Sequence, residues 1–217
     1  MRIQPKKILC AIDFSEFSDL VLRHGKAFAS EFGADLYLCH IIPSAYMVSS
    51  HITPYVDYTS IESHRVQQAQ DRLESLAREY GLEQNIVTEI GTPAETIEGI
   101  VQKEGFDMVI AATYGGSGLK RYLIGSVTDR LVKILSCPLL VLHPNEADKK
   151  LIVDKKIRLN KILVGCDFSE DSKLAFDYAL SLAQEFQTQL YLAHVLQPQD
   201  PTAMSNFDYV KLQEGDS

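Results

Sequence analysis

The sequence has few of the features that mark membrane, secreted or nucleic-acid-binding proteins. No stretch reaches the roughly 18 consecutive apolar residues that a membrane-spanning helix needs, and no long apolar run precedes the first acidic residue, Asp13, as a signal peptide would require. The 21 lysine and arginine residues are outnumbered by 29 aspartate and glutamate residues, which disfavours a general nucleic-acid binder because such proteins present a basic face. We therefore expect a soluble, cytoplasmic protein that binds neither nucleic acid nor a membrane.

Cysteine is also scarce, and its spacing does not favour a metal site. The chain holds four cysteines, none of them in a CxxC pair, and each lies in or beside an apolar run: Cys10, Cys39, Cys137 and Cys166. Free cysteines behave as small apolar residues, and disulfides are rare in reducing compartments. We expect buried free thiols, with metal or disulfide use as the less favoured alternative.

What the chain does contain is a long internal repeat. Residues 7–41 align without a gap with residues 161–195, at a constant offset of 154, and 16 of the 35 aligned residues are identical. The copies open with KILCAIDFSEFS and KILVGCDFSEDS and close with LYLCHI and LYLAHV. Solenoid repeats have periods of about 20–50 residues, so this spacing indicates two copies of one domain.

The first copy continues as an alternation of apolar runs and amphipathic segments. We predict strands at residues 7–12, 36–42, 85–90, 107–113 and 139–142, and helices at residues 16–32, 61–80, 93–105 and 126–136. Strands that alternate with helices form parallel β-α-β units. The sequence therefore predicts an open α/β fold of the Rossmann-like type, with a parallel five-stranded sheet covered by helices on both faces.

Two of the predicted helices begin beside residues that can cap them. Asp13 or Ser15 is placed to cap the first helix. Before the third helix, Thr92 can cap, Pro93 suits the first helical position, and Glu95 would complete a capping box.

The domain organisation follows from the repeat and from charge. Residues 1–144 are expected to form one complete domain, and residues 145–160, rich in lysine, aspartate and glutamate, a linker. Residues 161–217 hold a partial second copy, made of a strand, a helix and a strand, with a polar tail. Such a unit is only marginally stable on its own, so we expect it to be a truncated domain or one that another subunit completes.

Ligands of open parallel sheets bind beyond the carboxyl ends of the strands, where the strand order reverses. Three segments of the first domain should meet there. The first strand ends in Ala11, Ile12 and Asp13, the second ends around Ile41, and the loop 112–128 follows the fourth. A ligand site is therefore expected between these segments.

The loop 112–128 is glycine-rich and leads into a helix. It reads ATYGGSGLKRYLIGSVT. Glycine lets the backbone approach a ligand closely, and the free N–H groups of a helix that begins at Ser126 suit a phosphate. The loop is neither a Walker loop, which ends in Gly-Lys-Ser/Thr, nor a GxGxxG dinucleotide fingerprint, which follows the first strand. On these residues alone, phosphate binding and a plain tight turn both stay open.

Several segments together resemble the universal stress protein family. They are KILCAIDFSEFS, LYLCHI, GTPAETI, GGSGLKRYLIGSVTDRLV and CPLLVLHP, and they cover residues 5–144 in the family's order. The second copy matches only the family's opening, which resembles the tandem members. The resemblance implies an adenine nucleotide alpha hydrolase-like fold that binds ATP or another adenine nucleotide, with Mg²⁺ or Mn²⁺ as a candidate companion ion. It also implies a homodimer that pairs through the last strand, and a regulatory or stress-response role.

The same resemblance implies roles for single residues. The family's pattern of Gly, two residues, Gly, nine residues and Gly-Ser/Thr falls on Ala112, Gly115, Gly125 and Ser126, so alanine stands where the first glycine is expected. The implied roles are contact with the nucleoside for Asp13, lining of the adenine pocket for Ile41, close approach to the phosphates for Gly115 and Gly125, and hydrogen-bond donation for Ser126, Val127 and Thr128.

Some of these residues also have roles that do not involve binding. Asp13 can simply cap a helix, and Tyr114 can stack on a ligand or only cover the pocket. His40 and His194 close the second strand of each copy, and we expect satisfied, half-buried histidines there rather than ligands.

Three functions are compatible with the sequence. The first is an ATP-binding regulatory protein, supported by the loop 112–128 together with Asp13. The second is a dimeric interaction module without nucleotide, in which Ala112 marks the loss of binding. The third is an ATP hydrolase, which needs a positioned water or base. Asp13 and Asp129 are the only acids that accompany the glycine loop, so slow hydrolysis is the most we expect.

Overall fold

The computed structural model describes residues 4–44, 58–113, 125–143, 152–153 and 156–196. The chain divides next to Leu159 into two compact units. The first unit contains the larger sheet and its helices, and the second begins at Asn160.

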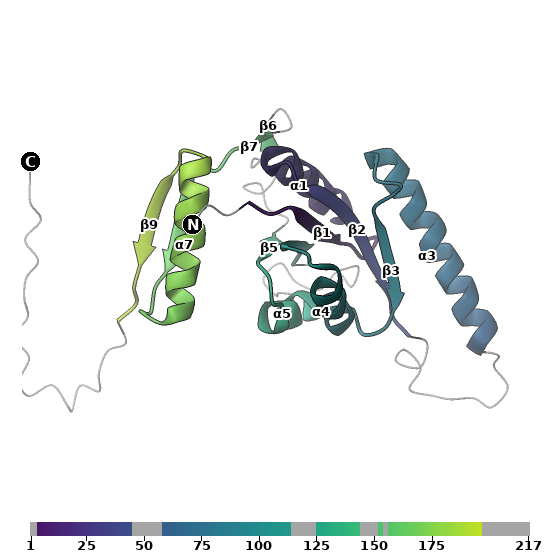
Figure 1. The fold of residues 1–217 in the computed structure, drawn as a ribbon. Coiled ribbons are helices and arrows are strands. Elements are labelled where there is room, and N and C mark those ends of the chain that lie inside the picture. Colours follow the sequence, from purple (N-terminus) through teal and green to yellow (C-terminus); the bar gives the residue numbers. More distant parts are fainter. Residues whose placement is uncertain (1–3, 45–57, 114–124, 144–151, 154–155, 197–217) are drawn as a thin grey trace, which may run out of the picture. The chain divides into compact units, whose positions relative to one another are not determined.

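The first unit is built on a parallel five-stranded sheet with the strand order β3-β2-β1-β4-β5 (Figure 1). Its strands are β1 (Lys7–Ala11), β2 (Asp35–Ile42), β3 (Ile86–Ile90), β4 (Met108–Ala112) and β5 (Leu139–Leu142). The chain places β2 and β3 on one side of β1, and β4 and β5 on the other. The order of the strands therefore reverses between β1 and β4, which is where open α/β sheets bind ligands.

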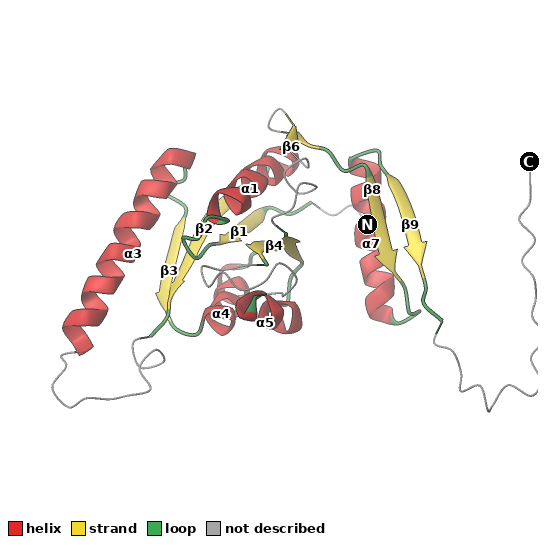
Figure 2. Cartoon of the chain, turned by 180° about the vertical axis from the view of Figure 1, so that it is seen from behind, coloured by secondary structure: helices red, strands yellow, loops and turns green. Residues whose placement is uncertain are grey.

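Helices cover both faces of this sheet, as Figures 1 and 2 show. They are α1 (Ser18–Phe32), α3 (Tyr58–Tyr80), α4 (Pro93–Glu104) and α5 (Ser126–Ile134). Alternate residues of β1 point to opposite faces. Cys10 packs toward α1, where its thiol lies 3.6 Å from the Val21 carbonyl, whereas Leu9 packs with Ile97 of α4 and Leu131 of α5. The predicted α/β fold with a five-stranded parallel sheet is confirmed.

The predicted start of the first helix is wrong. Helix α1 begins at Ser18, and its N-cap residue, Phe17, makes no capping hydrogen bond with its side chain. Neither Asp13 nor Ser15 caps the helix, because both take part in a turn that precedes it. Asp13 Oδ1 accepts a hydrogen bond from the Ser15 backbone N–H at 2.9 Å, and Ser15 Oγ accepts one from Phe17 N–H at 3.3 Å.

The capping box predicted for α4 does not form in the structure. Thr92 is the N-cap residue and Pro93 occupies the first turn, as predicted, but the Thr92 side chain makes no capping hydrogen bond. Glu95 instead accepts a hydrogen bond from Arg130 of α5, with 2.9 Å between Arg130 Nε and Glu95 Oε1. This ion pair lowers the pKa of the Glu95 carboxyl and ties α4 to α5.

The segment expected to be a linker contains a short antiparallel hairpin. Its strands are β6 (Ile152–Val153) and β7 (Lys156–Ile157), and Ile157 is buried. A strand of two residues is too short to show a pattern of apolar residues, so the sequence did not indicate these strands. The hairpin belongs to the first unit and packs against α1.

The second unit repeats the first strand, helix and strand of the chain. It contains β8 (Lys161–Gly165), α7 (Glu170–Glu185) and β9 (Gln189–Ala193), with β8 and β9 parallel. Here the serine of the Asp-Phe-Ser sequence does cap the helix, because Ser169 Oγ accepts a hydrogen bond from the Ser172 N–H. The polar tail, residues 197–217, lies outside the described residues.

All four cysteines are free, but only two are fully buried. Cys10 and Cys39 are buried, and Cys137 and Cys166 are half-buried. Burial raises the pKa of the Cys39 thiol to about 12 and that of Cys137 to about 11, so both are protonated near neutral pH. In the part of the chain that is described, no helix is long and apolar enough to cross a membrane.

Candidate functional site

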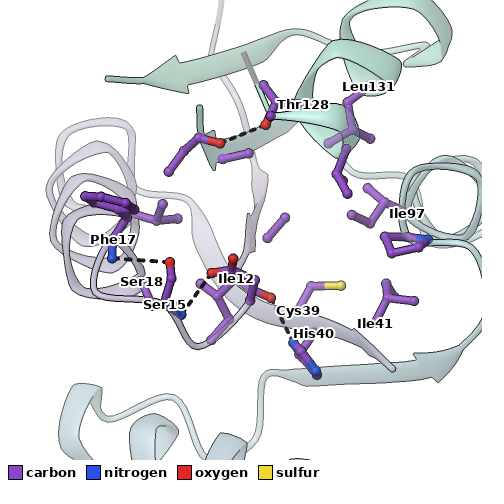
Figure 3. A pocket seen from close by; sticks show the side chains of 18 of the residues that line it. Ile12, Ser15, Phe17, Ser18, Cys39, His40, Ile41, Ile97, Thr128 and Leu131 are labelled. Carbon is purple, nitrogen blue, oxygen red and sulfur yellow. Dashed lines mark hydrogen bonds between the residues drawn. The ribbon is translucent and has the colours of Figure 1, made fainter. Parts of the chain in front are cut away.

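A cavity of about 410 Å³ lies at the carboxyl ends of β1 and β4, where the order of the strands reverses. This volume falls within the range of about 300–1,000 Å³ that is usual for small-molecule sites. Figure 3 shows its walls, which come from the turn after β1, the end of β2, the starts of α4 and α5, and the end of β4.

Most of the residues expected at the site lie around this one cavity. Nine of them line it: Ala11, Ile12, Asp13, Ile41, Ala112, Gly125, Ser126, Val127 and Thr128. The other two, Tyr114 and Gly115, lie outside the described residues. The chain thus brings together three segments that are up to about 100 residues apart in sequence.

One wall is the turn between β1 and α1. The backbone of Ile12 is fixed to β2, since its N–H donates to the Cys39 carbonyl at 2.9 Å. Asp13 follows as an exposed residue, and its Oδ1 accepts the Ser15 N–H. Asp13 is therefore oriented while its charge stays at the mouth of the cavity.

The turn contains a strained residue. Phe14 has a φ of 59°, in the left-handed region that bulky side chains seldom adopt, at a typical cost of about 1–3 kcal/mol. The ring of Phe14 lies against that of His40, with 4.2 Å between their centroids, and His40 Nδ1 donates to the Ile12 carbonyl at 2.9 Å. Burial lowers the pKa of His40, although the bond to Ile12 and the charge of Asp13 oppose the shift.

The expectation for the two histidines holds for one of them. His40 is half-buried with a satisfied ring nitrogen, as expected, whereas His194 is exposed. His194 nevertheless repeats the hydrogen bond of its counterpart, with 2.6 Å between its Nδ1 and the Cys166 carbonyl oxygen.

The opposite wall is the amino-terminal end of α5. Gly125 is the N-cap residue, and Ser126 and Val127 are the first exposed residues of the helix. The first N–H groups of a helix have no partner within it and carry a partial positive charge. This end of α5 opens into the cavity, so it offers a place for an anion next to the carboxyl end of β4.

Thr128 fixes the start of α5 to the sheet. Its hydroxyl is buried and donates to the Ala112 carbonyl at 2.7 Å. The Gly125 N–H donates to the Thr113 carbonyl, which adds a second tie between the same segments. Ala112 thus contributes its backbone to the framework of the site as well as its methyl group to the lining.

We predict that Thr128→Val lowers the free energy of unfolding by about 1–2 kcal/mol, because valine has the shape of the buried threonine but takes away the hydroxyl that donates to the Ala112 carbonyl. Urea denaturation of the whole chain measures this difference. Thr128→Ser keeps the hydroxyl and serves as the control. Equal losses in the valine and serine variants would show that the methyl group, and not the hydrogen bond, stabilises this position.

The remaining wall is apolar and was not predicted from the sequence. It includes the buried residues Cys39 and Ile97, with Pro43 and Pro93 half-buried. Sequence patterns place Ile97 on the apolar stripe of α4 but do not show which end of the sheet that stripe covers. Since α4 follows β3, it packs on the face shared with α5, and its first turn reaches the cavity.

The cavity therefore joins an apolar wall, a carboxylate and a helix start. Such a set of groups suits a molecule with a flat apolar part, hydroxyl or amino donors, and an anionic group, which is the chemistry of a nucleotide. In the described part of the chain, no group of three His, Cys, Asp or Glu residues is placed to hold a metal ion.

Comparison with known proteins matches both copies of the repeat to one family. The model of the universal stress protein family matches residues 5–143 and, a second time, residues 158–216. The universal stress protein MJ0577 of Methanocaldococcus jannaschii is 28% identical over 156 residues, which are 65% of this chain and 96% of that protein. A universal stress protein of Mycolicibacterium smegmatis is 29% identical over 195 residues, or 87% of this chain and 63% of that protein.

Solved structures show the same fold. The structure of MJ0577 superposes with a TM-score of 0.56 at 29% identity, covering 66% of this chain and 99% of that chain. A universal stress protein from Archaeoglobus fulgidus superposes with a TM-score of 0.65 at 21% identity, covering 93% of this chain and 71% of that one. The second likeness spans both units of the present chain and concerns the fold alone.

Proposed function

Because the chain belongs to the universal stress protein family, we propose that its first unit binds an adenine nucleotide, ATP in particular, in the cavity at the carboxyl ends of β1 and β4. The observation that carries the proposal is the meeting of Asp13, Ile41 and the start of α5 around one cavity of suitable size. The proposed role is regulatory: the protein would change its contacts with other molecules according to the nucleotide it holds.

The apolar wall is the proposed place for the adenine ring. Ile41 and Ile97 are buried side chains that line the cavity, and Pro43 and Pro93 add rigid apolar surface. A planar base binds most favourably to apolar side chains that are already in place before it arrives. Asp13, at the edge of this wall, is placed to accept a hydrogen bond from a hydroxyl or amino group of the nucleoside.

The start of α5 is the proposed place for the phosphates. Ser126 can donate through its hydroxyl group and backbone N–H, Val127 through its N–H, and the helix dipole adds positive potential. The methyl group of Ala112, where the family's pattern has glycine, narrows the path beside the phosphates. The cavity keeps its volume of about 410 Å³ with this methyl group present, so we propose that alanine is tolerated.

We propose nucleotide binding rather than rapid hydrolysis. Asp129 lies one turn into α5, whose start is the proposed phosphate site, and forms an ion pair with Lys133, with 2.6 Å between Oδ2 and Nζ. A carboxylate engaged in this way is poorly suited to activate a water molecule. Hydrolysis, if measured by release of phosphate, is expected to be slow.

We also propose a cytoplasmic homodimer that pairs through the edge of the sheet. β5 is an edge strand whose residues Leu139, Leu140 and Val141 are only half-buried. An apolar edge strand is a template for pairing with a second strand. Pairing of two β5 strands would cover these side chains in both copies.

Isothermal titration of the whole chain with ATP tests the proposed function. We expect saturable binding with one site per chain, and a loss of about threefold to tenfold in affinity in Ser126→Ala, which removes one neutral hydrogen-bond donor. ADP and AMP titrated in parallel show how much the terminal phosphates contribute. An absence of heat with all three nucleotides would exclude the proposed function.

A further inference from the structure

The turn that carries Asp13 is built twice in this chain, with the same unusual backbone. Phe14 has a φ of 59° and Phe168, its counterpart 154 residues later, a φ of 64°. Both belong to an Asp-Phe-Ser sequence, and in both the aspartate accepts the N–H of the serine, at 2.9 Å for Ser15 and 3.0 Å for Ser169. Bulky residues avoid this region of φ, so other contacts in each copy must stabilise the left-handed conformation of the phenylalanine.

The same histidine contact holds the turn in both copies. In the first unit the His40 ring lies 4.2 Å from that of Phe14 and its Nδ1 is 2.9 Å from the Ile12 carbonyl oxygen. In the second, His194 lies 4.6 Å from Phe168 and its Nδ1 is 2.6 Å from the carbonyl oxygen of residue 166. We name the first set, Ile12, Phe14 and His40, the histidine clasp.

The clasp does not depend on the rest of the sheet. His40 is half-buried at the cavity, whereas His194 is exposed, yet the hydrogen bond and the ring contact are alike. Its geometry is therefore a local property of the strand, helix and strand. The His40 Nδ1 must carry the proton in this contact, because the Ile12 carbonyl can only accept.

A third side chain strengthens the clasp in the first unit. The guanidinium carbon of Arg72, in α3, lies 4.4 Å from the centroid of the Phe14 ring, and its Nη2 donates to the Phe14 carbonyl at 3.5 Å. A cation over an aromatic ring is attracted by its quadrupole. The described residues of the second unit contain no counterpart of α3, so this contact is added where the cavity lies.

The clasp encloses Asp13. His40 fixes the carbonyl of the residue before Asp13 and the ring of the residue after it, and Ser15 fixes the carboxylate itself. Figure 3 shows His40, Ile12 and Ser15 together at this corner of the cavity. The backbone on both sides of Asp13 is thus held before any ligand arrives, which reduces the ordering that binding requires.

We propose that His40 is a positioning residue of the nucleotide site, which acts through Ile12 and Phe14 to hold Asp13 in the geometry that the nucleoside needs. This inference rests on the proposed function and adds to it a residue whose effect on the ligand is indirect. The hydrogen bond from Nδ1 is the essential contact, and the ring contact with Phe14 supports it.

Three variants of the whole chain test this inference. His40→Leu fills the space and keeps an apolar contact with Phe14, but removes the donor to Ile12. His40→Asn keeps a donor at the position of Nδ1. His194→Leu makes the same histidine-to-leucine substitution in the second unit, where none of the described residues lines the cavity. Each is titrated with ATP, and hydrogen exchange of the Ser15 backbone N–H is followed by NMR without nucleotide.

We expect His40→Leu to weaken ATP binding about tenfold and to speed exchange of the Ser15 N–H by about the same factor. His40→Asn should stay within about threefold of the unaltered chain in both measurements. His194→Leu should give the same affinity and the same exchange rate as the unaltered chain. Unchanged affinity and exchange in His40→Leu, or equal losses in the leucine and asparagine variants, would overturn the inference. If the unaltered chain takes up no ATP, the proposed function fails, whereas exchange of the Ser15 N–H still decides whether His40 holds the turn.

Discussion

Replacing Asp13 by alanine is expected to weaken ATP binding about thirtyfold. The carboxylate lies at the mouth of the cavity, held by the Ser15 N–H, in a position to accept a hydrogen bond from the nucleoside. A hydrogen bond to a charged group contributes about 1.5–3 kcal/mol, which corresponds to about a tenfold to 150-fold change in the dissociation constant. Asp13 is exposed, so its removal should leave the fold intact. Isothermal titration measures the loss.

The chain contains a matched control for this experiment. Asp167 occupies the same position in the second unit and accepts hydrogen bonds from both the N–H and the hydroxyl of Ser169, which lower the pKa of its carboxyl to about 2. Asp167→Ala should leave the affinity for ATP unchanged. Equal effects of the two substitutions, or no effect of either, would show that Asp13 does not contact the nucleotide.

The second large effect is expected at Gly25, in the middle of α1. A β-carbon at this position would lie 2.2 Å from the Cys10 thiol sulfur and 3.0 Å from Leu36 Cδ1. Cys10 and Leu36 are buried on the sheet beneath the helix, so neither can move aside without disturbing its neighbours. We expect Gly25→Ala to lower the free energy of unfolding by about 3 kcal/mol, measured by urea denaturation, although alanine favours helices over glycine.

Two further variants identify the cause of that loss. A β-carbon added at Gly99, in α4, would have open space around it to a distance of 4 Å, so Gly99→Ala should stabilise the chain by about 0.5–1 kcal/mol. Cys10→Ala removes the sulfur, and combined with Gly25→Ala it should lose less stability than the two single changes added together. Additive losses would show that the contact with Cys10 is not the reason for the glycine.

The larger features of this fold could be predicted from the sequence because they depend on local patterns. The alternation of apolar strands with amphipathic helices predicted the parallel sheet, and Gly33 and Gly105, with φ of 64° and 70°, end their helices as expected of glycine. Strand ends differ from prediction by at most one residue, since the final residue of a strand carries no signal of its own.

The features that could not be predicted depend on contacts between distant residues. The late start of α1 follows from the left-handed Phe14, and no local preference indicates that a phenylalanine adopts this conformation. Its stabilising partners, His40 and Arg72, are 26 and 58 residues away in sequence. The place of Ile97 in the apolar wall could not be predicted, because the sequence does not show which face of the sheet α4 covers.

The two copies of the repeat also differ in ways that sequence identity does not show. Leu9 and Leu38 are fully buried in the first unit, whereas their counterparts Leu163 and Leu192 are 71% and 56% exposed in the second. The described residues of the second unit include no counterpart of β4 or α5, the elements that complete the cavity in the first. The repeated turn is thus present twice, but the described cavity belongs to the first unit.

The most direct test of the proposed nucleotide site is an experimental structure of the whole chain with bound ATP. We expect one nucleotide per chain in the cavity of the first unit, with the adenine ring against Ile41, the nucleoside in contact with Asp13, and the phosphates at the N–H groups of Ser126 and Val127. A nucleotide bound elsewhere on the chain, or a cavity without nucleotide at a saturating concentration of ATP, would contradict it.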